Sequence, residues 1–417
     1  MQPDLLHHTA IRWLEPDPKH VPLLAGAGVT IAVSPPHAAF EAACRTAGIG
    51  VAHEADMRIA ATVEEAAKTP SAAVKAGLWP GIQRQDPQTA SATRSLWLDQ
   101  NCGLVNTIRA LHPKVPPVLG YMANKEAGVS EGQLIPWDAL ELALVDAWTA
   151  GGNYLLAPDS RLLQGVLSGT AEARAAWRKL GQTAAWLRAN EALFRQPPLP
   201  IVTILADSDM SQEIASLAFR NSVSPRVVSA ANPPAPDPAR CQVLVAVAID
   251  KPSGEVRKRI IAHAVAGASV VVDGGAGSWW THEALKFVRR DADREYLSTG
   301  KGQVVAYKTD VEDPGSLALD VIDILTQNRR AARLWNLNGG LTFATEAPAG
   351  RGAAVLHAIN YSRPQELPVL ARIQGTFRKA TLLTPEAAAV DLRVAPRMGG
   401  SEVAIPKLQR VATVVFN

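Results

Sequence analysis

Six carboxylates stand at or just after short apolar runs between residues 10 and 160. Two carboxylates that face each other across a bound substrate, one protonated and one ionised, can act as general acid and as base or nucleophile. Parallel strands bring such groups together at their carboxyl ends. A solvated loop acid or a helix N-cap is the alternative role for each. The six candidates are Glu15, Glu54, Asp56, Asp99, Glu126 and Asp159.

Asp99 and Glu54 are the best placed of these candidates. Asp99 ends the alternating run RSLWLD, close to Trp97 and two residues before Asn101, so its surroundings are polar with an aromatic edge. Glu54 and Asp56 occupy alternating positions in VAHEAD, which in a strand would project both carboxylates to the same side and separate their pKa values. The same spacing also occurs at an ordinary strand end that faces water. Asp99 is therefore the first candidate for a catalytic carboxylate.

The elements that would position these side chains alternate between short apolar runs and amphipathic helical patterns up to about residue 195. The runs are AIRWLE, VTIAVS, GIGVAHE, GLWPGIQ, RSLWLD, PPVLGYM and GNYLLAP. Between them lie segments such as HAAFEAACRTAG, in which apolar residues recur at helical spacing and a glycine ends the pattern. Strands separated by crossover helices predict an α/β fold with a parallel sheet. Seven such units predict a small or incomplete (β/α) TIM-type barrel over residues 1–197, since a full eight-unit barrel usually takes about 250 residues.

Two further regions follow a proline-rich joint, QPPLP, at residues 196–200. Residues 198–334 again alternate strands and helices, as in IVTILAD, SQEIASLAFRN and CQVLVAVAI, which predicts a flavodoxin-like or amidotransferase-like α/β domain. From residue 335 the sequence changes to short alternating strands separated by turn residues, such as AAVLHAINYS and LPVLARIQG. These strands predict a small all-β sandwich domain over residues 335–417.

Composition and charge favour a globular protein and exclude several classes of function. The 417 residues are 47% hydrophobic and 19% charged, with a formal net charge of +3. The basic clusters at residues 257–259 and 289–290 are short and lie in helical patterns, so we expect solvated helix faces and no nucleic-acid partner. No run approaches the roughly 18 apolar residues of a membrane span, so we expect no span.

Cofactors and metals are not indicated by the sequence. The three cysteines, Cys44, Cys102 and Cys241, are isolated, which predicts buried free thiols. The histidines are scattered, with no HExxH motif or paired spacing, so we expect no metal and no cofactor. The start MQPDLLHHTA lacks the basic and apolar regions of a signal peptide. The compartment is therefore open: cytoplasmic as the sequence stands, or periplasmic or secreted if a signal peptide was removed.

The order of the three regions, and several segments within them, resemble multidomain glycoside hydrolases. LHAINYS, Leu356–Ser362, is similar to the opening strand of the C-terminal sandwich in family 42 β-galactosidases and their relatives. AGASVVVDGGAG and KGQVVAYKTDVEDPGSLALDVIDIL resemble the later part of such enzymes, and ALELALVDAWTAGGNYLLAPD resembles their late barrel helix and strand. These enzymes combine a barrel, an amidotransferase-like domain and a small β-domain. The resemblance implies a carbohydrate substrate or ligand at the barrel strand ends.

The chain departs from that family in its catalytic residues. Retaining members carry an Asn-Glu pair at one strand end, whereas the nearest approach here is Asn124-Lys125-Glu126. Glu126 could serve as a general acid, and the alternative is that the charge of Lys125 holds it ionised. The family's catalytic pair is therefore not carried over. Asp99, Glu54 and Glu126 stay candidates for the catalytic carboxylates from their placement alone.

Aromatic and amide side chains near the strand ends would bind the sugar, because flat rings stack on sugar faces. The substrate-binding candidates are Trp13, Trp79, Trp97, Asn101 and Tyr121. For each tryptophan, packing beneath the helices is the alternative. We predict a glycoside hydrolase-like protein that hydrolyses or binds a glycan, and the alternative is a catalytically inactive structural or interaction protein with a degenerate barrel. A homo-oligomer formed through the middle domain is a further expectation.

Overall fold

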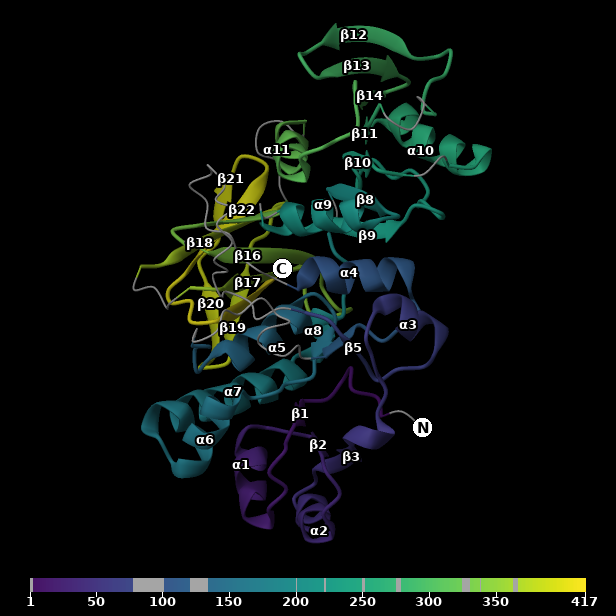
Figure 1. Cartoon of the computed structure of the whole chain (residues 1–417). Helices are drawn as coiled ribbons and strands as arrows, with labels where there is room; N and C mark the ends of the chain where they lie inside the picture. The colour runs from purple at the N-terminus through teal and green to yellow at the C-terminus, as the bar shows by residue number, and fades with distance from the viewer. Residues whose placement is uncertain are drawn as a thin grey trace.

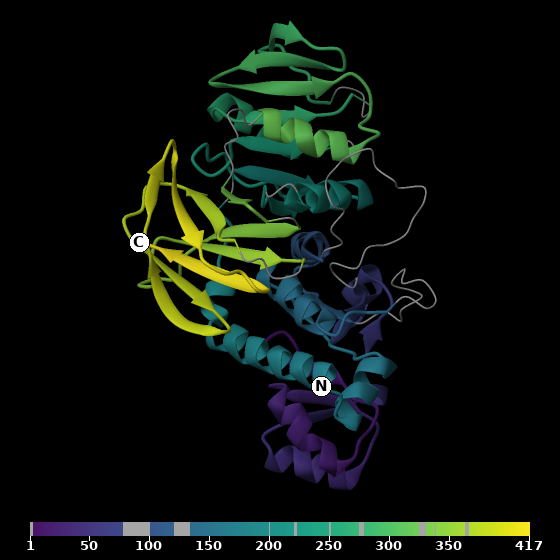
Figure 2. The same ribbon diagram turned by 90° about the vertical axis from the view of Figure 1, so that its left-hand side faces the viewer.

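The computed structural model arranges the chain in three regions that follow one another in sequence. Figure 1 shows helices and short strands in the first region, a sheet with flanking helices in the second, and strands alone in the third. Figure 2 shows the third region, in yellow and light green, beside the long helix α7 (Ala171–Ala189). The structure describes residues 3–77, 101–120, 134–199, 201–220, 223–249, 252–274, 279–324, 331–337, 339–362 and 367–417.

Among its described residues the first region has seven short strands, which are parallel and follow one another in chain order. They are β1 (Ala10–Arg12), β2 (Ile31–Ser34), β3 (Gly50–His53), β4 (Ile59–Ala60), β5 (Ala73–Lys75), β6 (Val118–Gly120) and β7 (Asn153–Tyr154). β1 to β3 form one sheet and β4 to β7 another, and each strand pairs in parallel with its neighbour in sequence. A parallel bridge between Ile11 and Leu156 joins the two sheets. The predicted parallel arrangement of this region is confirmed.

The predicted and observed strands of this region do not match one for one. The runs GLWPGIQ and RSLWLD fall almost entirely within residues 78–100, outside the described residues. β4 and β5 hold only two and three residues and show no extended alternation of apolar and polar side chains. The sequence pattern therefore does not predict them, because a period of two needs several residues to be recognised.

Helices cover these strands, and one of them is buried along its whole length. The helices are η1 (Pro18–His20), α1 (Val21–Gly26), α2 (Ala38–Thr46), η2 (Glu54–Asp56), α3 (Val63–Lys68), α4 (Cys102–Leu111), α5 (Ala139–Thr149), α6 (Ser160–Ser168), α7 and α8 (Glu191–Phe194). α5 is apolar on nearly every side, and such a helix is stable only when protein surrounds it. It packs against α7, β7 and β17 (Ala354–Asn360), so it lies between the first and third regions.

The second region is built on a seven-stranded sheet. Its elements are β8 (Val202–Ala206), α9 (Asp209–Arg220), β9 (Arg226–Ser229), β10 (Val243–Ala246), α10 (Gly254–Ala266), β11 (Ser269–Val272), β12 (Lys286–Arg290), β13 (Arg294–Thr299), β14 (Gly302–Tyr307) and α11 (Pro314–Ile324). The strand order is β12-β13-β14-β11-β10-β8-β9, and the five strands from β14 to β9 are parallel. Numbered along the chain, those five strands lie in the order 2-1-3-4-5, which is a doubly wound order.

A hairpin at one edge of this sheet corrects one expectation from the sequence. β12 and β13 pair antiparallel, and every residue of β12 is exposed. Arg289 and Arg290 therefore lie on an exposed edge strand and not on a helix face. The charged side chains that made the segment look like a solvated helix also suit a solvent-exposed edge strand. Residues 257–259 lie on α10, as expected.

The third region consists of two antiparallel sheets. Its strands are β15 (Ala332–Trp335), β16 (Gly340–Glu346), β17, β18 (Val369–Gln374), β19 (Ala380–Thr384), β20 (Ala387–Leu392), β21 (Ala395–Arg397), β22 (Gly400–Ile405) and β23 (Val411–Phe416). One sheet has the order β15-β18-β22-β21 and the other β16-β17-β23-β19-β20. The predicted antiparallel character of this region is confirmed.

β17 is buried on both faces because it separates two apolar cores. Val355 and Ile359 belong to the core of the first region. Leu356 and Ala358 belong to the core that the third region shares with the second. The residues of the neighbouring strand β23 are divided between the same two cores in the same way. The third region therefore completes the core of the first.

Candidate functional site

Arg12 and Glu54 form an ion pair at the carboxyl ends of two parallel strands. Arg12 is the last residue of β1, and Glu54 follows β3 directly. Arg12 Nε lies 3.0 Å from Glu54 Oε1 and 3.2 Å from Oε2, and Arg12 Nη2 lies 2.9 Å from Oε1. The two side chains are 25% and 40% exposed, so the pair is partly open to solvent. An ionised carboxylate held in this way can act as a nucleophile, a base or an electrostatic stabiliser.

A second polar contact lies at the same edge of the sheet. His53, the last residue of β3, places Nε2 3.6 Å from Glu41 Oε1 and Nδ1 3.3 Å from the carbonyl oxygen of Ser34. Ser34 ends β2, and Glu41 lies in the first turn of α2. The carboxyl ends of β1, β2 and β3 thus contribute to one polar edge.

The expected strand geometry for Glu54 and Asp56 is wrong. β3 ends at His53, and residues 54–56 form the 3-10 helix η2. Strand alternation no longer applies there, because a 3-10 helix turns once every three residues. Glu54 therefore pairs with the cation Arg12, whereas the sequence pattern had placed it beside a second carboxylate.

The other predicted residues either lie outside the described residues or have a different role in the structure. Asp99, Glu126, Trp79, Trp97 and Tyr121 lie outside the described residues. Asp159 caps α6, since its Oδ1 accepts a hydrogen bond from the backbone N of Leu162 at 2.7 Å. Asp159 therefore serves as a helix N-cap, the alternative role to catalysis. Glu15 contributes its carbonyl oxygen, which accepts from Trp13 Nε1 at 2.7 Å.

Trp13 is a core residue. Its side chain is fully buried, and its ring packs against His20 and Trp177, with both pairs of ring centroids 5.9 Å apart. No ring face is left open for a sugar to stack on. The stacking role predicted for Trp13 is replaced by packing beneath the helices.

Asn101 is also buried, in a polar cluster that the sequence pattern does not reveal. Its backbone N donates to Asp146 Oδ2 at 2.6 Å, and the Tyr361 hydroxyl donates to Asp146 Oδ1. Burial raises the pKa of Asp146 to about 6, although both hydrogen bonds act in the opposite direction. Asn101 and Asp146 are 1% and 0% exposed. The cluster therefore joins the first region to the third, and this buried position does not support the predicted contact of Asn101 with substrate.

The segment LHAINYS makes the same junction. His357 Nε2 donates to the carbonyl oxygen of Leu193 at 3.2 Å, and its Nδ1 accepts from Thr413 Oγ1 at 2.9 Å. Asn360 Nδ2 donates to the carbonyl oxygen of Gln409 at 3.0 Å. These polar residues hold β17 to its neighbours and to the end of the first region. The segment that carries the family resemblance is thus a structural joint.

Neither a metal-binding cluster nor a membrane-spanning helix is found among the described residues. Within them, no three His, Cys, Asp or Glu side chains are grouped so that they could hold a metal ion. A helix long and apolar enough to cross a membrane is likewise absent from that part of the chain. Cys44, Cys102 and Cys241 are buried free thiols, as predicted.

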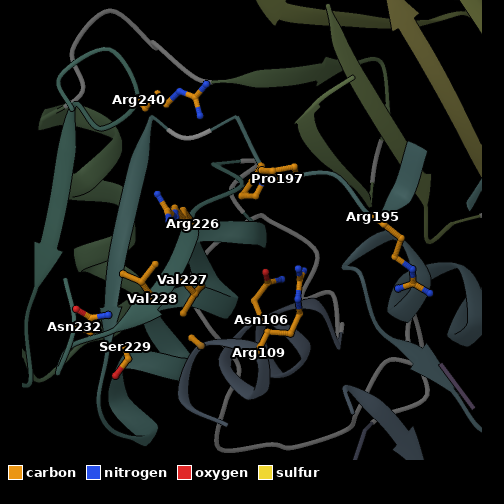
Figure 3. A pocket seen from close by; sticks show the side chains of 12 residues that line it. Asn106, Arg109, Arg195, Pro197, Arg226, Val227, Val228, Ser229, Asn232 and Arg240 are labelled. Atoms are coloured by element: carbon orange, nitrogen blue, oxygen red, sulfur yellow. The ribbon is translucent and has the colours of Figure 1, made fainter. Parts of the chain in front are cut away.

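A cavity of about 650 Å³ lies away from the strand carboxyl ends. Figure 3 shows Asn106 and Arg109 of α4 on one side of it, with Arg226 on the side formed by β9. Arg195 and Arg240 complete its charged lining. The described residues that line it include no acid, so the cavity is cationic. It cannot supply the paired carboxylates that glycoside hydrolysis requires.

Comparison with known proteins identifies the fold. No protein-family model matches the sequence, and no curated protein matches it by sequence. The structure is similar to α-L-fucosidase isoenzyme 2 from Paenibacillus thiaminolyticus, with a TM-score of 0.51 and 12% identity over 91% of this chain and 70% of the fucosidase. A rhamnosidase from Novosphingobium sp. PP1Y matches at a TM-score of 0.49 and 13% identity, over 91% of this chain and 38% of the rhamnosidase.

A family 42 β-galactosidase from G. stearothermophilus matches at a TM-score of 0.43 and 13% identity, over 89% of this chain and 66% of the galactosidase. The chain thus spans between about two fifths and about 70% of the length of these three proteins. At such low identity the similarity concerns the fold alone. The predicted resemblance to glycoside hydrolases is confirmed at that level.

Proposed function

We propose that the chain is a glycoside hydrolase-like protein that binds or hydrolyses a glycan at the carboxyl ends of its first-region strands. The observation that carries this proposal is the Arg12–Glu54 pair, which places an ionised carboxylate at the edge shared by β1, β2 and β3. Similarity in fold to a fucosidase over 91% of the chain makes a sugar the first substrate class to test.

Under this proposal the first region, residues 1–197, is an incomplete (β/α) barrel. The seven parallel strands among its described residues follow chain order, and the bridge from Ile11 to Leu156 connects the segment after the last strand to the first. Among the described residues β3 and β4 do not pair, which leaves the barrel open at that point. Residues 198–334 are then an amidotransferase-like domain and residues 335–417 a β-sandwich domain. A barrel of this kind carries its site at the strand carboxyl ends.

The proposed roles divide between two carboxylates. Glu54, paired with Arg12, is suited to the ionised role of nucleophile, base or stabiliser. The protonated partner is then Asp99, with Glu126 as the next candidate, because both follow predicted strands in the same region. Trp79, Trp97 and Tyr121 are the proposed sugar-contacting side chains. No cofactor is part of this scheme.

Activity is tested with the full chain and aryl glycosides. α-L-Fucosides, rhamnosides and β-galactosides come first, because the structural neighbours are named as a fucosidase, a rhamnosidase and a β-galactosidase. A glycan array then tests binding without turnover. Binding on the array with no release of aryl group supports a glycan-binding protein. Silence in both assays rejects the proposal and leaves a structural or interaction protein.

A further inference from the structure

Four arginines line the cavity between the first and second regions. Arg109 belongs to α4, Arg195 follows α8, Arg226 begins β9 and Arg240 precedes β10. The volume of about 650 Å³ falls in the range of small-molecule sites. Asn106, Ser229 and Asn232 add neutral polar groups to the wall. The described part of the lining is thus rich in donors and includes no acidic side chain.

The positive charges of two of these guanidinium groups are already paired with carboxylates of the protein. Arg195 Nε lies 3.3 Å from Glu191 Oε1, and the Arg195 guanidinium stacks over Trp148 at 4.7 Å from the ring centroid. Arg240 Nη1 lies 2.8 Å from Glu346 Oε1. Arg195 and Arg240 therefore shape the cavity and contribute positive potential, but their strongest interactions are internal.

Arg109 and Arg226 differ from that pair. Within the described part of the chain neither forms an ion pair with a carboxylate. Among the described residues, Arg109 donates only to the Ala150 carbonyl oxygen, at 3.3 Å, although a guanidinium carries five N–H donors. Burial lowers the pKa of Arg109, and burial together with the nearby Arg109 charge lowers the pKa of Arg195. Positive charges placed together in this way repel one another unless an anion lies between them.

The cavity lies at the opposite edge of the first region from Glu54. Arg109 contacts Ala150, which ends α5 just before β7. Arg195 donates to the carbonyl oxygens of Gly152 at 3.2 Å and Leu6 at 3.0 Å, and these residues precede β7 and β1. These are the amino ends of the strands. The cavity is therefore separate from the proposed glycan site and does not depend on it.

We infer that this cavity binds a small molecule carrying a phosphate or sulfate group. Arginines that line the cavity from α4 and from β9 suit an anion whose oxygens point in several directions, whereas a planar carboxylate is satisfied by a single guanidinium fork. The ligand contacts both regions, because Arg109 belongs to the first and Arg226 to the second. Binding therefore stabilises the junction between them as well as the fold.

Isothermal titration of the full chain with pyrophosphate, inorganic phosphate, sulfate and citrate tests the inference. The double variant Arg109→Gln/Arg226→Gln is compared with Arg178→Gln/Arg393→Gln, which removes two exposed arginines outside the cavity and so matches the change in net charge. We expect saturable binding of pyrophosphate to the wild type, and about tenfold or greater weakening only in the cavity variant. Pyrophosphate should also raise the Tm of the wild type, because it binds the folded state.

The anion that binds most tightly shows whether the natural ligand carries a phosphate or a sulfate group. Stronger binding of pyrophosphate and phosphate than of sulfate indicates a phosphate-bearing ligand, and the reverse order indicates a sulfate ester. The inference is overturned if the wild type binds none of these anions, if citrate binds best, or if both double variants weaken binding equally. Folding of each variant is checked by its unfolding transition. A Glu54→Gln variant should bind pyrophosphate like the wild type, which keeps this test independent of the glycan proposal.

Discussion

The hydroxyl of Tyr361, which directly follows strand β17, donates a hydrogen bond to Oδ1 of Asp146 in helix α5, and this contact is buried. The same carboxylate accepts from the backbone N of Asn101 at 2.6 Å. Both donors stabilise a negative charge that burial disfavours. The contact therefore links the stability of the junction between regions to the ionisation of one side chain.

Tyr361→Phe should destabilise the protein, and more so at neutral than at acidic pH. The variant removes a donor from a buried carboxylate, a loss of about 1–3 kcal/mol in the free energy of unfolding. The folded-state pKa of Asp146, already raised to about 6, should rise further. At pH 5 the carboxyl of Asp146 is largely protonated in the folded protein, so removal of the donor should lower the free energy of unfolding by less. Urea unfolding at pH 7 and pH 5 measures both losses, and equal losses would contradict the assigned role of Asp146.

His357 should make the protein less stable as the pH falls. Burial lowers its folded-state pKa to about 4, from about 6.5 in the unfolded chain. The neutral ring is favoured in the fold, so protonation below about pH 6.5 stabilises the unfolded chain, and the loss grows until about pH 4, up to roughly 3 kcal/mol. Asp146 acts in the opposite direction, because its raised pKa destabilises the fold as the pH rises from about 4 to 6.

A comparison with His357→Gln separates the two effects. Gln cannot be protonated, so the variant should lose the part of the pH dependence that His357 causes and keep the part that Asp146 causes. The difference in unfolding free energy between wild type and variant should therefore shrink as the pH falls from 7 to 4.5. A difference that stays constant across this range would show that His357 does not titrate as its burial indicates.

Gly103 is required where helix α4 meets helix α9. A Cβ atom at this position would lie 2.0 Å from Ser216 Oγ and 3.0 Å from Ser216 Cα. Gly103→Ala should lower the free energy of unfolding by about 1–3 kcal/mol through overpacking at the junction of the first two regions. Gly254→Ala, at a helix position with open space around the new methyl group, is the matched control and should have little effect. Similar losses in both variants would argue against this close approach.

Once a sugar substrate is found, Glu54→Gln and Asp99→Asn should each lower turnover by several orders of magnitude. The first removes the ionised carboxylate beside Arg12, and the second removes the predicted acid. Glu283→Gln alters an exposed carboxylate of the second region and should leave turnover unchanged. If Glu54→Gln keeps near wild-type kcat while folding normally, the ion pair is structural. If Asp99→Asn does so, Glu126 becomes the next residue to test.

Self-association through the second region can be tested at strand β12. This strand forms the edge of the seven-stranded sheet, and Phe287 and Val288 are 60% and 56% exposed. Unpaired backbone groups beside apolar side chains favour pairing with another copy. We expect a dimer in sedimentation velocity that dissociates in the Phe287→Lys variant. A wild-type monomer at all accessible concentrations would exclude this contact.

Local sequence patterns predict a strand well where burial on both faces of the sheet alone determines the residue types. The runs VTIAVS, IVTILAD and CQVLVAVAI are parallel strands because continuous β-branched segments suit a sheet covered on both faces. β17 shows the limit of the pattern. Its sequence AVLHAIN is almost entirely apolar because two different cores cover it, and only the tertiary structure reveals the second core.

The cationic cavity lies beyond what the sequence can predict. Arg109, Arg195, Arg226 and Arg240 are far apart in the chain, and each stands in an unremarkable context. They meet only because β9 lies at one edge of its sheet and α4 packs beside it. Trp13 shows that the sequence can also suggest a site residue wrongly. Its position near a strand end suggested a binding role, but helices distant in sequence cover its side chain.

The position of β23 has a consequence for synthesis of the protein. Val411 and Val415 fill part of the first region's core, yet they are translated long after the strands that they cover. While the ribosome is still making the second region, the nascent first region exposes an apolar surface that has no partner. Such a surface invites aggregation and recognition by chaperones. Folding of the earliest part of the chain should therefore be completed after synthesis of residue 415, and slow translation should prolong its dependence on chaperones.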